Sequence, residues 1–336
     1  MWRLIEVFRD MRYRENNALR ELRWDPILRE WIMISSGRKT RPWQPQNFCP
    51  FCPGSPETGF GWDVLILENR YPMLSEESPE PDSHYFYRRG RAVGKCYVVV
   101  ETPIHDLDDL SDLPLEHVEK IIKVVAEKMR EDMKREYAKY FLWFRNKGRE
   151  IGVSLDHPHS QIYLMPFTPS RIERELESSR DYWRDRGRCL FCDIIDVESR
   201  EGIRVLMESR RYIVFMPFYS HWPFEAHIYP RRHVGLLTDL DDEEIRELAL
   251  VLKRTLCGFK RLFKSKSSPY IMVLHQAPLK GEYEFYHMHI EIYGLLRDES
   301  KLKYAAGMEI GGGNFTYDSI PEENALMLKK AIELCD

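Results

Sequence analysis

The stretch His157-Pro-His159-Ser-Gln161 is followed directly by the apolar residues Ile162, Tyr163 and Leu164. Residues two apart on a β-strand point to the same face, so both histidines and the glutamine would project side by side. An imidazole can act as a nucleophile, a base or a metal ligand, whereas a glutamine side chain can only donate and accept hydrogen bonds. A solvated polar face is the alternative interpretation, but the apolar residues that follow indicate a buried strand and favour a functional site.

A second copy of this pattern lies in the other half of the chain. His287-Met-His289 repeats the paired histidines, and Cys189-Leu-Phe-Cys192 repeats Cys49-Pro-Phe-Cys52. A histidine stands between these landmarks at a similar place in each half, His105 in the first and His233 in the second. It follows the second cysteine by 53 residues in the first half (105 − 52) and by 41 in the second (233 − 192). The next intervals are 52 (157 − 105) and 54 (287 − 233), so the order and spacing predict a duplicated module fused into one structure.

Each copy contains the elements of a mixed helix and sheet module. Apolar residues recur with a helical period over about 114–137, and a long helix is also predicted over about 241–263. Strands are predicted at 96–101, 140–144 and 270–274. The expected fold class is therefore α+β, with antiparallel sheets and long helices packed on them.

Two highly charged segments suggest how the chain is divided. Residues 1–23 carry an amphipathic, alternating-charge pattern that predicts a helical arm. Residues 168–188 contain neither glycine nor proline except Pro169 and Gly187, and predict a helical connector. We therefore expect three parts, which are an arm at 1–23, a first module at 24–188 and a second module at 189–336.

The composition sets limits on the class of protein. Of 336 residues, 43% are hydrophobic and 31% charged, which is enough apolar material for a sizeable core and excludes a disordered chain. The formal net charge of −4 argues against a nucleic-acid partner bound through bulk positive charge. The sequence contains neither an apolar run of about 18 residues nor the apolar core of a secretory signal, so we expect no membrane partner and a cytoplasmic location.

The cysteines indicate metal or redox chemistry. There are seven, an odd and sparse number that does not suggest a secreted disulfide framework. Four of them form the two CxxC pairs, which in a cytosolic chain are typical of metal binding or thiol chemistry. The remaining three, Cys96, Cys257 and Cys335, receive no role.

The first CxxC pair can form a zinc site with two histidines. Two sulfur and two nitrogen donors are a set that tetrahedral zinc prefers, and the candidates are Cys49, Cys52, His105 and His157. A thiol pair or a disulfide is the alternative. In the second half, His275, His287 and His289, with Glu291 on the same alternation, favour a metal or substrate site. The duplication predicts a competing set of Cys189, Cys192, His233 and His287, and His287 cannot easily serve both.

Two further segments have the residue types of a phosphate site. Arg38-Lys-Thr-Arg41 precedes Trp43, and two arginines there could hold a phosphate bidentately, although a solvated charge run is equally compatible. Gly311-Gly-Gly-Asn314 could let the backbone approach a phosphate, but such clusters are more often turns.

These motifs together resemble the galactose-1-phosphate uridylyltransferase family of the histidine triad superfamily. The resemblance runs over almost the whole chain, from about 25 to 329. It rests on the motifs WxMxSSxRxxRPW at 31–43, CPFC at 49–52, FxNKG at 144–148, GxSxxHPHxQ at 152–161, WPFE at 222–225, HQAP at 275–278, HMH at 287–289 and KYxxGxE at 303–309.

The resemblance implies two histidine-triad-like modules and a double-displacement reaction. His159 would attack the α-phosphorus of UDP-glucose and release glucose 1-phosphate, and galactose 1-phosphate would then accept the UMP group to give UDP-galactose. Gln161 would hydrogen-bond the phosphoryl oxygens, and Ser154 would contact the donor phosphate. Glutamine in place of a third histidine favours transfer over hydrolysis.

The resemblance also implies the ligands of each site. Zinc would bind Cys49, Cys52, His105 and His157. A second zinc or an iron would bind Glu175, His275, His287 and His289. The nucleoside of a small-molecule nucleotide sugar would contact Phe51, Asn69, Phe144, Asn146, Gly152 and Val153. Residues supplied across a homodimer interface to the shared active sites, where the sugar phosphate also binds, would be Arg38, Arg41, Lys303, Tyr304 and Glu309.

Three positions depart from the family pattern and keep other functions open. Family members often lack the second CxxC pair. The family's glutamine that contacts the sugar phosphate falls at about Phe315, and Tyr71 follows Asn69-Arg70 where the family usually has an acidic residue and phenylalanine. A phosphorylase that uses ADP-glucose or a dinucleoside polyphosphate is therefore a second hypothesis. A zinc-dependent nucleotide-binding scaffold is a third, but a scaffold has no need for a second imidazole beside Gln161.

Overall fold

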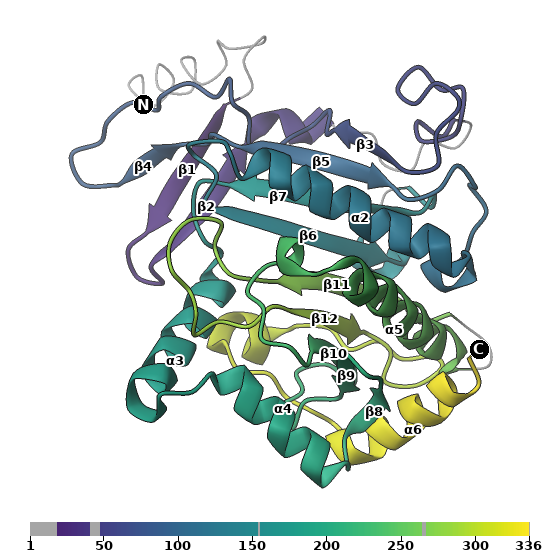
Figure 1. Ribbon diagram of the computed structural model, residues 1–336. Coiled ribbons are helices and arrows are strands. Elements are labelled where there is room, and N and C mark those ends of the chain that lie inside the picture. Colours follow the sequence, from purple (N-terminus) through teal and green to yellow (C-terminus); the bar gives the residue numbers. More distant parts are fainter. Residues whose placement is uncertain (1–18, 41–47, 154, 264–266, 336) are drawn as a thin grey trace.

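The computed structural model describes residues 19–40, 48–153, 155–263 and 267–335 (Figure 1). These residues form a three-stranded and a nine-stranded sheet. The small sheet contains β1 (Arg20–Asp25), β2 (Glu30–Ser35) and β4 (Arg89–Arg91). The large sheet contains β3 (Leu65–Glu68), β5 (Lys95–Val100), β6 (Tyr140–Lys147), β7 (His159–Met165), β8 (Val205–Glu208), β9 (Tyr212–Phe215), β10 (Phe224–Pro230), β11 (Tyr270–His275) and β12 (His289–Gly294).

The helices include five of at least three turns and several short ones. The longer helices are α2 (Leu115–Asp132), α3 (Ser170–Arg186), α4 (Leu190–Glu201), α5 (Asp242–Arg261) and α6 (Pro321–Glu333). The short ones are η1 (Ser36–Thr40), η2 (Leu110–Asp112), η3 (Arg149–Ile151), η4 (Leu237–Asp239) and the π-helical turn η5 (Gly307–Gly312). No helix among the described residues combines the length and the apolar character needed to span a membrane.

The large sheet repeats one strand order on either side of its centre. Its full order is β3-β5-β7-β6-β11-β12-β10-β9-β8, and β6 pairs with β11 in the middle, with Asn146 opposite Ile271. Outward from this pair, the first half runs β6-β7-β5-β3 and the second runs β11-β12-β10-β9, with α2 and α5 at equivalent places in the chain. This repetition confirms the predicted duplicated α+β module, and both copies share one continuous antiparallel sheet.

Helices α2 and α5 cover the same face of the large sheet and pack against each other (Figure 1). The apolar stripe that predicted the first helix is buried, with Val118, Ile121 and Val125 at most 1% exposed. A single apolar core runs beneath both helices and across the β6–β11 boundary. The two modules are therefore stabilised as one unit by burial of apolar surface.

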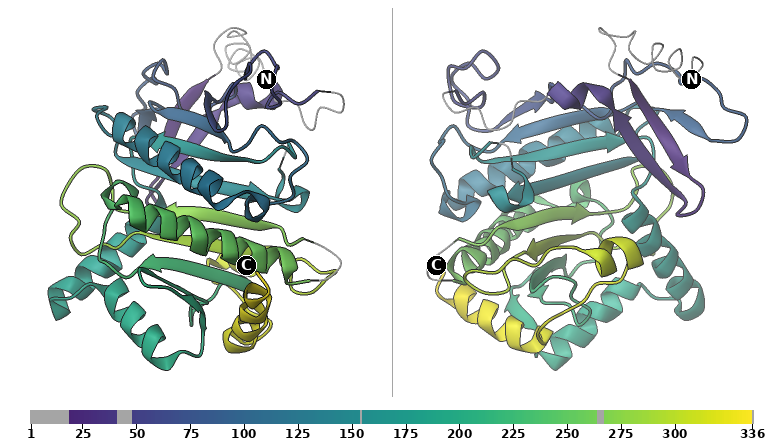
Figure 2. Two further views of the ribbon diagram at one scale, coloured as in Figure 1. Left: turned by 45° about the vertical axis from the view of Figure 1, so that its right-hand side comes forward. Right: turned by 180° about the vertical axis from the view of Figure 1, so that it is seen from behind.

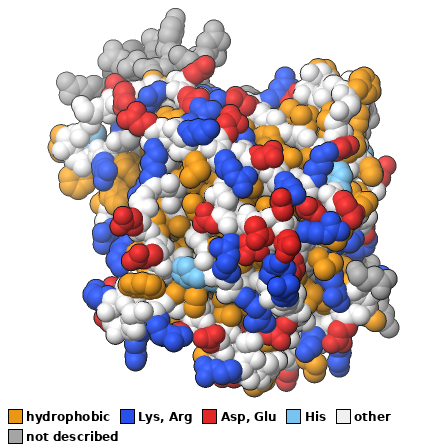
Figure 3. Space-filling view, in the orientation of Figure 1, with side chains coloured by type: hydrophobic (Ala, Val, Ile, Leu, Met, Phe, Trp, Pro, Cys, Tyr) orange, Lys and Arg blue, Asp and Glu red, His pale blue; other side chains and the backbone are white. Residues whose placement is uncertain are grey.

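Oppositely charged side chains are interspersed on the outer face of these two helices (Figure 3). Some ion pairs join the modules, such as Lys123 Nζ to Asp242 Oδ1 at 2.9 Å and Arg246 Nη1 to Glu119 Oε2 at 3.4 Å. Exposed pairs of this kind contribute only about 0–1 kcal/mol each. These ion pairs therefore contribute little to the stability of the fold compared with the buried apolar core.

The other face of the large sheet carries the small sheet over the first module and α3 and α4 over the second (Figure 2). Leu22 of β1 packs there with Cys96 and Met165, whose side chains leave β5 and β7 on that face. Strand alternation places His159 and Gln161 of β7 on this same face, away from α2. The helix predicted at 168–188 is present as α3, which begins after Pro169 and ends before Gly187.

The structure corrects three expectations from the sequence. The predicted helical arm at 1–23 lies mostly outside the described residues, and Arg20–Arg23 belong to strand β1 because Leu22 pairs with Met33 in a hairpin. The predicted strand that would carry both histidines of the first motif begins only at His159, so His157 precedes it. In the second module, β12 likewise begins at His289.

A disulfide joins Cys257 on α5 to Cys335 beyond the end of α6, two cysteines to which the sequence assigned no role. They are 78 residues apart, and closing a loop of that length stabilises a fold by about 4 kcal/mol in the chain-entropy description. We expect Cys335→Ala to lower the free energy of unfolding by about this amount, measured by denaturant titration without reductant. A reductant should lower the stability of the unmodified chain similarly and leave the variant unchanged. The prediction would be contradicted if reductant did not change the free energy of unfolding of the unmodified chain.

Candidate functional site

His159 stands at the first position of β7, on the open face of the first module. Its Nδ1 lies 2.9 Å from the carbonyl oxygen of His157. A carbonyl oxygen can only accept a hydrogen bond, so the ring nitrogen that faces it must donate; the proton therefore sits on Nδ1 and the lone pair on Nε2. The ring of Phe51 packs against His159 with centroids 5.3 Å apart. These contacts fix both the tautomer and the orientation of the imidazole, which suits a nucleophile.

Gln161 follows His159 on the same face of β7, as the sequence predicted. It lies between Val98 of β5 and Phe144 of β6 in the strand register. The intervening Ser160 points to the opposite face, where its hydroxyl accepts from Trp143 Nε1 at 2.9 Å. The packing of Ser160 below the sheet therefore holds the carboxamide of Gln161 above it, next to the imidazole.

A cavity of about 440 Å³ opens beside His159. The predicted contact residues Asn146 and Val153 line it, together with His105 and His157. Its wall is completed from the second module by residues just before β11, which no sequence signal pointed to, namely Ser267 and Pro269. Both modules therefore shape the space in front of the imidazole.

The first cysteine and histidine set comes together within the first module although its members are far apart in the sequence. Cys52 Sγ lies 3.3 Å from His105 Nδ1 and 3.7 Å from His157 Nδ1, and the two Nδ1 atoms are 3.3 Å apart. Cys49 Sγ is 3.6 Å from His157 Nδ1. Tetrahedral zinc separates two nitrogen ligands by about 3.3 Å and a nitrogen from a sulfur by about 3.6 Å. The set fits zinc closely.

The ionisation of His157 also suits a ligand. Burial lowers the pKa of His157, so the ring is neutral near pH 7. Its Nε2 donates to the carbonyl oxygen of Thr102 at 2.8 Å, which places the lone pair on Nδ1, facing the cysteines. His157 and His159 thus use opposite ring nitrogens, although they are only two residues apart.

The second module holds the equivalent set. Cys192 Sγ lies 3.3 Å from His233 Nδ1 and 3.5 Å from His287 Nδ1, and the donor atoms of Cys189, Cys192, His233 and His287 all lie within 4.8 Å of one another. Neither cysteine is in a disulfide. This geometry matches the set that the duplication predicted, and it again suits zinc.

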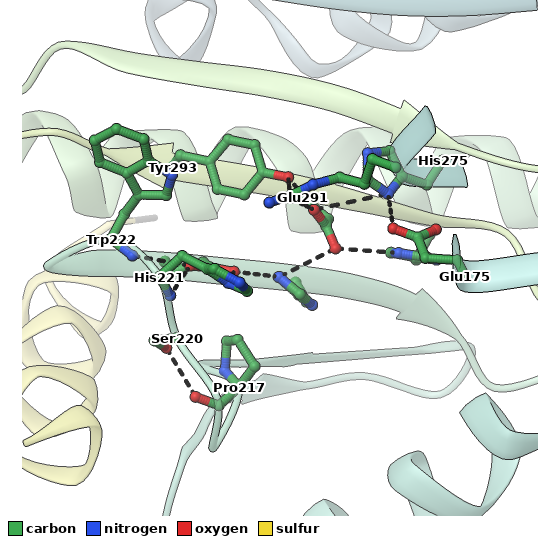
Figure 4. A network of polar contacts seen from close by, with 12 residues as sticks. Glu175, Pro217, Ser220, His221, Trp222, His275, Glu291 and Tyr293 are labelled. Atoms are coloured by element: carbon green, nitrogen blue, oxygen red, sulfur yellow. Dashed lines mark hydrogen bonds and ion pairs between the residues drawn. The ribbon is translucent and has the colours of Figure 1, made fainter. Parts of the chain in front are cut away.

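A third group of possible metal ligands is buried between α3, β11 and β12 (Figure 4). His275 Nδ1 lies 3.0 Å from Glu175 Oε1 and 3.7 Å from Glu291 Oε2, and His289 Nε2 lies 3.3 Å from Glu291 Oε1. Although burial opposes it, the carboxylates of Glu175 and Glu291 raise the pKa of His275. Two imidazoles and two carboxylates suit a divalent metal such as iron or zinc, which would replace the proton.

The structure resolves the competition for His287. The resemblance grouped this residue with Glu175, His275 and His289, but His287 lies with the cysteines, and Glu291 takes the fourth place beside the other three. The reason is that β12 begins at His289, so only His289 and Glu291 share a strand face. His289 repeats His159 in detail, since its Nδ1 lies 3.1 Å from the His287 carbonyl and its ring lies 5.2 Å from Phe191.

The other predicted contact residues are distributed around this face. Arg38 Nη1 donates to the hydroxyl of Tyr163 on β7 at 3.2 Å. Asn69 accepts from the Tyr71 backbone at 2.9 Å through Oδ1, forming a turn. Gly152 has φ +78°, a conformation that suits glycine. Ser154 and Arg41, which the sequence also selected, lie outside the described residues.

Three predicted site residues, Lys303, Tyr304 and Glu309, are not among the residues that line the cavity of their own chain. Lys303 is buried and its Nζ lies 3.3 Å from Glu309 Oε1, while Tyr304 is 67% exposed. Glu309 also accepts from the hydroxyl of Thr316 at 2.7 Å and from the backbone N–H of Ala306 at 3.0 Å, and these two hydrogen bonds hold the pKa of its carboxyl well below its usual range. Polar contacts therefore hold the segment after β12 together, and Tyr304 points outward.

Phe315, which lies at about the position where the resemblance implies a glutamine, belongs to this same segment. Its ring packs against His221 and Trp222, with centroids 4.8 and 5.6 Å away. The backbone N–H groups of His221 and Trp222 both donate to Glu225 Oε2 (Figure 4). Phe315 is thus part of an aromatic cluster, at about the position where the resemblance implies a polar contact.

Comparisons with known proteins cover nearly the whole chain. The family described as "Galactose-1-phosphate uridyl transferase, N-terminal domain" matches residues 9–169, and its C-terminal counterpart matches residues 175–335. The galactose-1-phosphate uridylyltransferase of Thermotoga maritima is 36% identical over 315 residues, which cover 92% of this chain and 98% of that protein.

Solved structures agree with this result. One described as "Structure of uridylyltransferase" superposes with a TM-score of 0.88 at 51% identity, covering 94% of this chain and 99% of the other. An ADP-glucose phosphorylase from Arabidopsis thaliana superposes with a TM-score of 0.72 at 26% identity, covering 93% of this chain and 99% of the other. From the family match over both halves and the relative at 36% identity, the chain belongs to the galactose-1-phosphate uridyl transferase family.

Proposed function

We propose that this protein is a nucleotidyltransferase that moves the UMP group of UDP-glucose to galactose 1-phosphate through a covalent intermediate on His159. The observation that carries the proposal is the arrangement of His159 itself. Its Nδ1 is hydrogen-bonded to the His157 carbonyl, its ring packs on Phe51 and lines the cavity, and Gln161 follows it on the same face of β7. Family membership selects the nucleotide sugar as the substrate of this arrangement.

The reaction balances in two steps. His159 Nε2 forms a bond to the α-phosphorus of UDP-glucose, and the bond from that phosphorus to the glucose 1-phosphate oxygen breaks. A phosphate oxygen of galactose 1-phosphate then attacks the same phosphorus and displaces His159, giving UDP-galactose. The proton on Nδ1 stays hydrogen-bonded to the His157 carbonyl throughout, so the cationic intermediate is stabilised without moving a proton.

The substrate contacts are proposals that follow the family pattern. Phe51, Phe144 and Val153 would pack on the nucleoside, while Asn69, Asn146 and Gly152 would bond its polar groups. Ser154 would contact the donor phosphate. Because the cavity wall of one chain contains none of Lys303, Tyr304 and Glu309, we propose that a partner subunit supplies them, with Arg38 and Arg41, in a cytoplasmic homodimer.

Zinc is the metal we propose for the cysteine sets. In the first module it would bind Cys49, Cys52, His105 and His157, and it would keep the start of β7 in place without taking part in the chemistry. In the second it would bind Cys189, Cys192, His233 and His287. The buried set of Glu175, His275, His289 and Glu291 would take a further zinc or an iron.

The proposed activity is tested by mixing the purified protein with UDP-glucose in the absence of an acceptor. Intact-mass measurement should then show one uridylyl group added per chain. Addition of galactose 1-phosphate should remove that mass and produce UDP-galactose. If no nucleotide sugar adds mass to the protein, the enzyme proposal is wrong.

A phosphorylase that acts on ADP-glucose is the second candidate. It is favoured by the apolar packing of Phe315 on His221 and Trp222 where the family has a polar contact, and one relative of this fold carries that activity in its name. The same mass experiment separates the two. An adenylyl adduct formed from ADP-glucose, with none formed from UDP-glucose, would replace the first proposal by this one.

Replacing Gln161 tests whether its carboxamide stabilises the charged phosphoryl oxygens during transfer. We expect Gln161→Ala to reduce the rate of uridylyl transfer by about 10²- to 10³-fold, because one donor to the charged phosphoryl oxygens is lost. The rate of adduct formation in a single turnover measures this. Metal content and thermal stability should remain those of the unmodified protein, since Gln161 belongs to none of the three metal sets. A rate within threefold of the unmodified protein would contradict the role.

A further inference from the structure

A chain of buried polar side chains runs beneath the large sheet, on the face opposite to His159. Arg145 of β6 is 3% exposed; its Nε donates to Glu101 Oε2 at 2.9 Å and its Nη1 to the Tyr270 hydroxyl at 2.8 Å. The Tyr270 hydroxyl in turn donates to Asp109 Oδ1 at 3.3 Å, and Lys147 Nζ lies 2.8 Å from Asp109 Oδ2. Arg145 therefore connects the first module to β11 of the second.

These side chains anchor both ends of the loop that carries a proposed zinc ligand. Glu101 and Asp109 flank His105, and each is fixed to β6, the first through Arg145 and the second through Lys147. Both carboxylate residues are fully buried. The position of His105 relative to β6 is thus set by two buried ion pairs, one at each end of a short loop.

Glu101 and the next residue are also hydrogen-bonded to the segment that carries His157 and His159. The N–H of Glu101 donates to the carbonyl of Pro158, between the two histidines, at 3.2 Å. The carbonyl of the next residue, Thr102, accepts from His157 Nε2. A shift of Glu101 would therefore move the segment 157–159 directly.

The charges in this chain balance. Two buried carboxylates, Glu101 and Asp109, face two cations, Arg145 and Lys147, whose side chains are 4% and 12% exposed. Lys147 Nζ also lies 3.4 Å from Asp108 Oδ2 on the exposed side. Burial raises the pKa of Glu101, and the guanidinium of Arg145 opposes that effect. Removing Arg145 alone leaves a buried carboxylate without a counter-charge, which is strongly destabilising. Removing the pair together avoids that loss and leaves Asp109 and Lys147 balanced.

We propose that Arg145 is a positioning residue for uridylyl transfer, which sets the placement of His157 and His159 by fixing Glu101 to β6 and β11. The proposal rests on the proposed function, because it concerns the rate of that reaction. Arg145 sits between Phe144 and Asn146, whose side chains point to the opposite, substrate-facing side of the strand. One strand thus holds the proposed nucleoside contacts above the sheet and the anchor of the nucleophile below it.

The test compares a charge-neutral double variant, Glu101→Gln with Arg145→Met, with the unmodified protein. Single-turnover formation of the uridylyl adduct from UDP-glucose is measured at a temperature where both are folded by circular dichroism. We expect the maximal rate to fall about 10- to 100-fold, as for other residues that orient a reacting group, with the UDP-glucose concentration for half-maximal rate within threefold. Tyr270→Phe, which removes one hydroxyl, should also lower the maximal rate of adduct formation, by a smaller factor.

A matched control lies far from this region in the second module. Arg204 is also buried, with Nη2 3.0 Å from Glu198 Oε1 and Nη1 2.9 Å from Glu322 Oε1. The double variant Glu198→Gln with Arg204→Met should lose stability but keep the adduct rate within twofold. The proposal is overturned if the Arg145 variant keeps its rate within twofold, or if the Arg204 control loses rate equally. Absence of any adduct on the unmodified protein would instead remove the proposed function.

Discussion

Replacing His159 with alanine is expected to lower the rate of uridylyl transfer by about 10⁴- to 10⁶-fold, the range seen when a covalent nucleophile is removed. Without Nε2 the two-step route is closed, and direct attack of one sugar phosphate on the other substrate must overcome the repulsion of two anions in one cavity. Steady-state turnover with both substrates measures the loss. Intact mass should show that the variant gains no uridylyl group from UDP-glucose.

The controls for this variant come from the structure. His159 is not among the ligands of any of the three metal sets, so zinc content and thermal stability should stay close to those of the unmodified protein. Peptide mapping of the unmodified adduct should place the uridylyl group on the peptide that contains His159. His289 has the same local contacts in the second module. A uridylyl group on His289 would assign the reaction to the second module and contradict the proposal.

The sequence predicted the duplication and the histidine motif because both depend on local patterns. Alternation along β7 was enough to place Gln161 beside His159, and the repeated landmarks were enough to predict two copies of one module. The grouping of Cys49, Cys52, His105 and His157 followed from donor chemistry, although their closeness depends on the order of strands in the sheet.

What the sequence could not supply depends on where elements begin and on partners distant in the chain. The assignment of His287 turned on β12 starting at His289, a boundary that alternation alone does not reveal. The charge pattern at 20–23 suggested a helix, but pairing of Leu22 with Met33 in the small sheet decided its conformation. The bond between Cys257 and Cys335 has no motif, since only the packing of α6 on α5 brings the two together.

Replacing Cys52 with serine is expected to remove one zinc per chain and to cost far more activity than the equivalent change in the second module. Cys52 Sγ touches both His105 and His157, so its loss opens the set that holds the start of β7. Binding of structural zinc contributes about 10–16 kcal/mol in small zinc domains, more than many folds have in total, so stability should fall as well. The displaced His157 carbonyl can no longer hold Nδ1 of His159, and adduct formation should drop at least about 100-fold.

Cys192→Ser is the matched control, because Cys192 Sγ makes the same two contacts, with His233 and His287. It should also lose one zinc and some thermal stability, but it leaves the first module and its nucleophile unchanged. Elemental analysis, thermal unfolding and single-turnover adduct formation on the two variants, side by side, measure these differences. Since β6 and β11 join the modules in one sheet, a small effect of Cys192→Ser on the rate is compatible with this account. Equal loss of rate in both variants would not be, because it would mean that zinc acts through the stability of the whole fold and not through the position of His157.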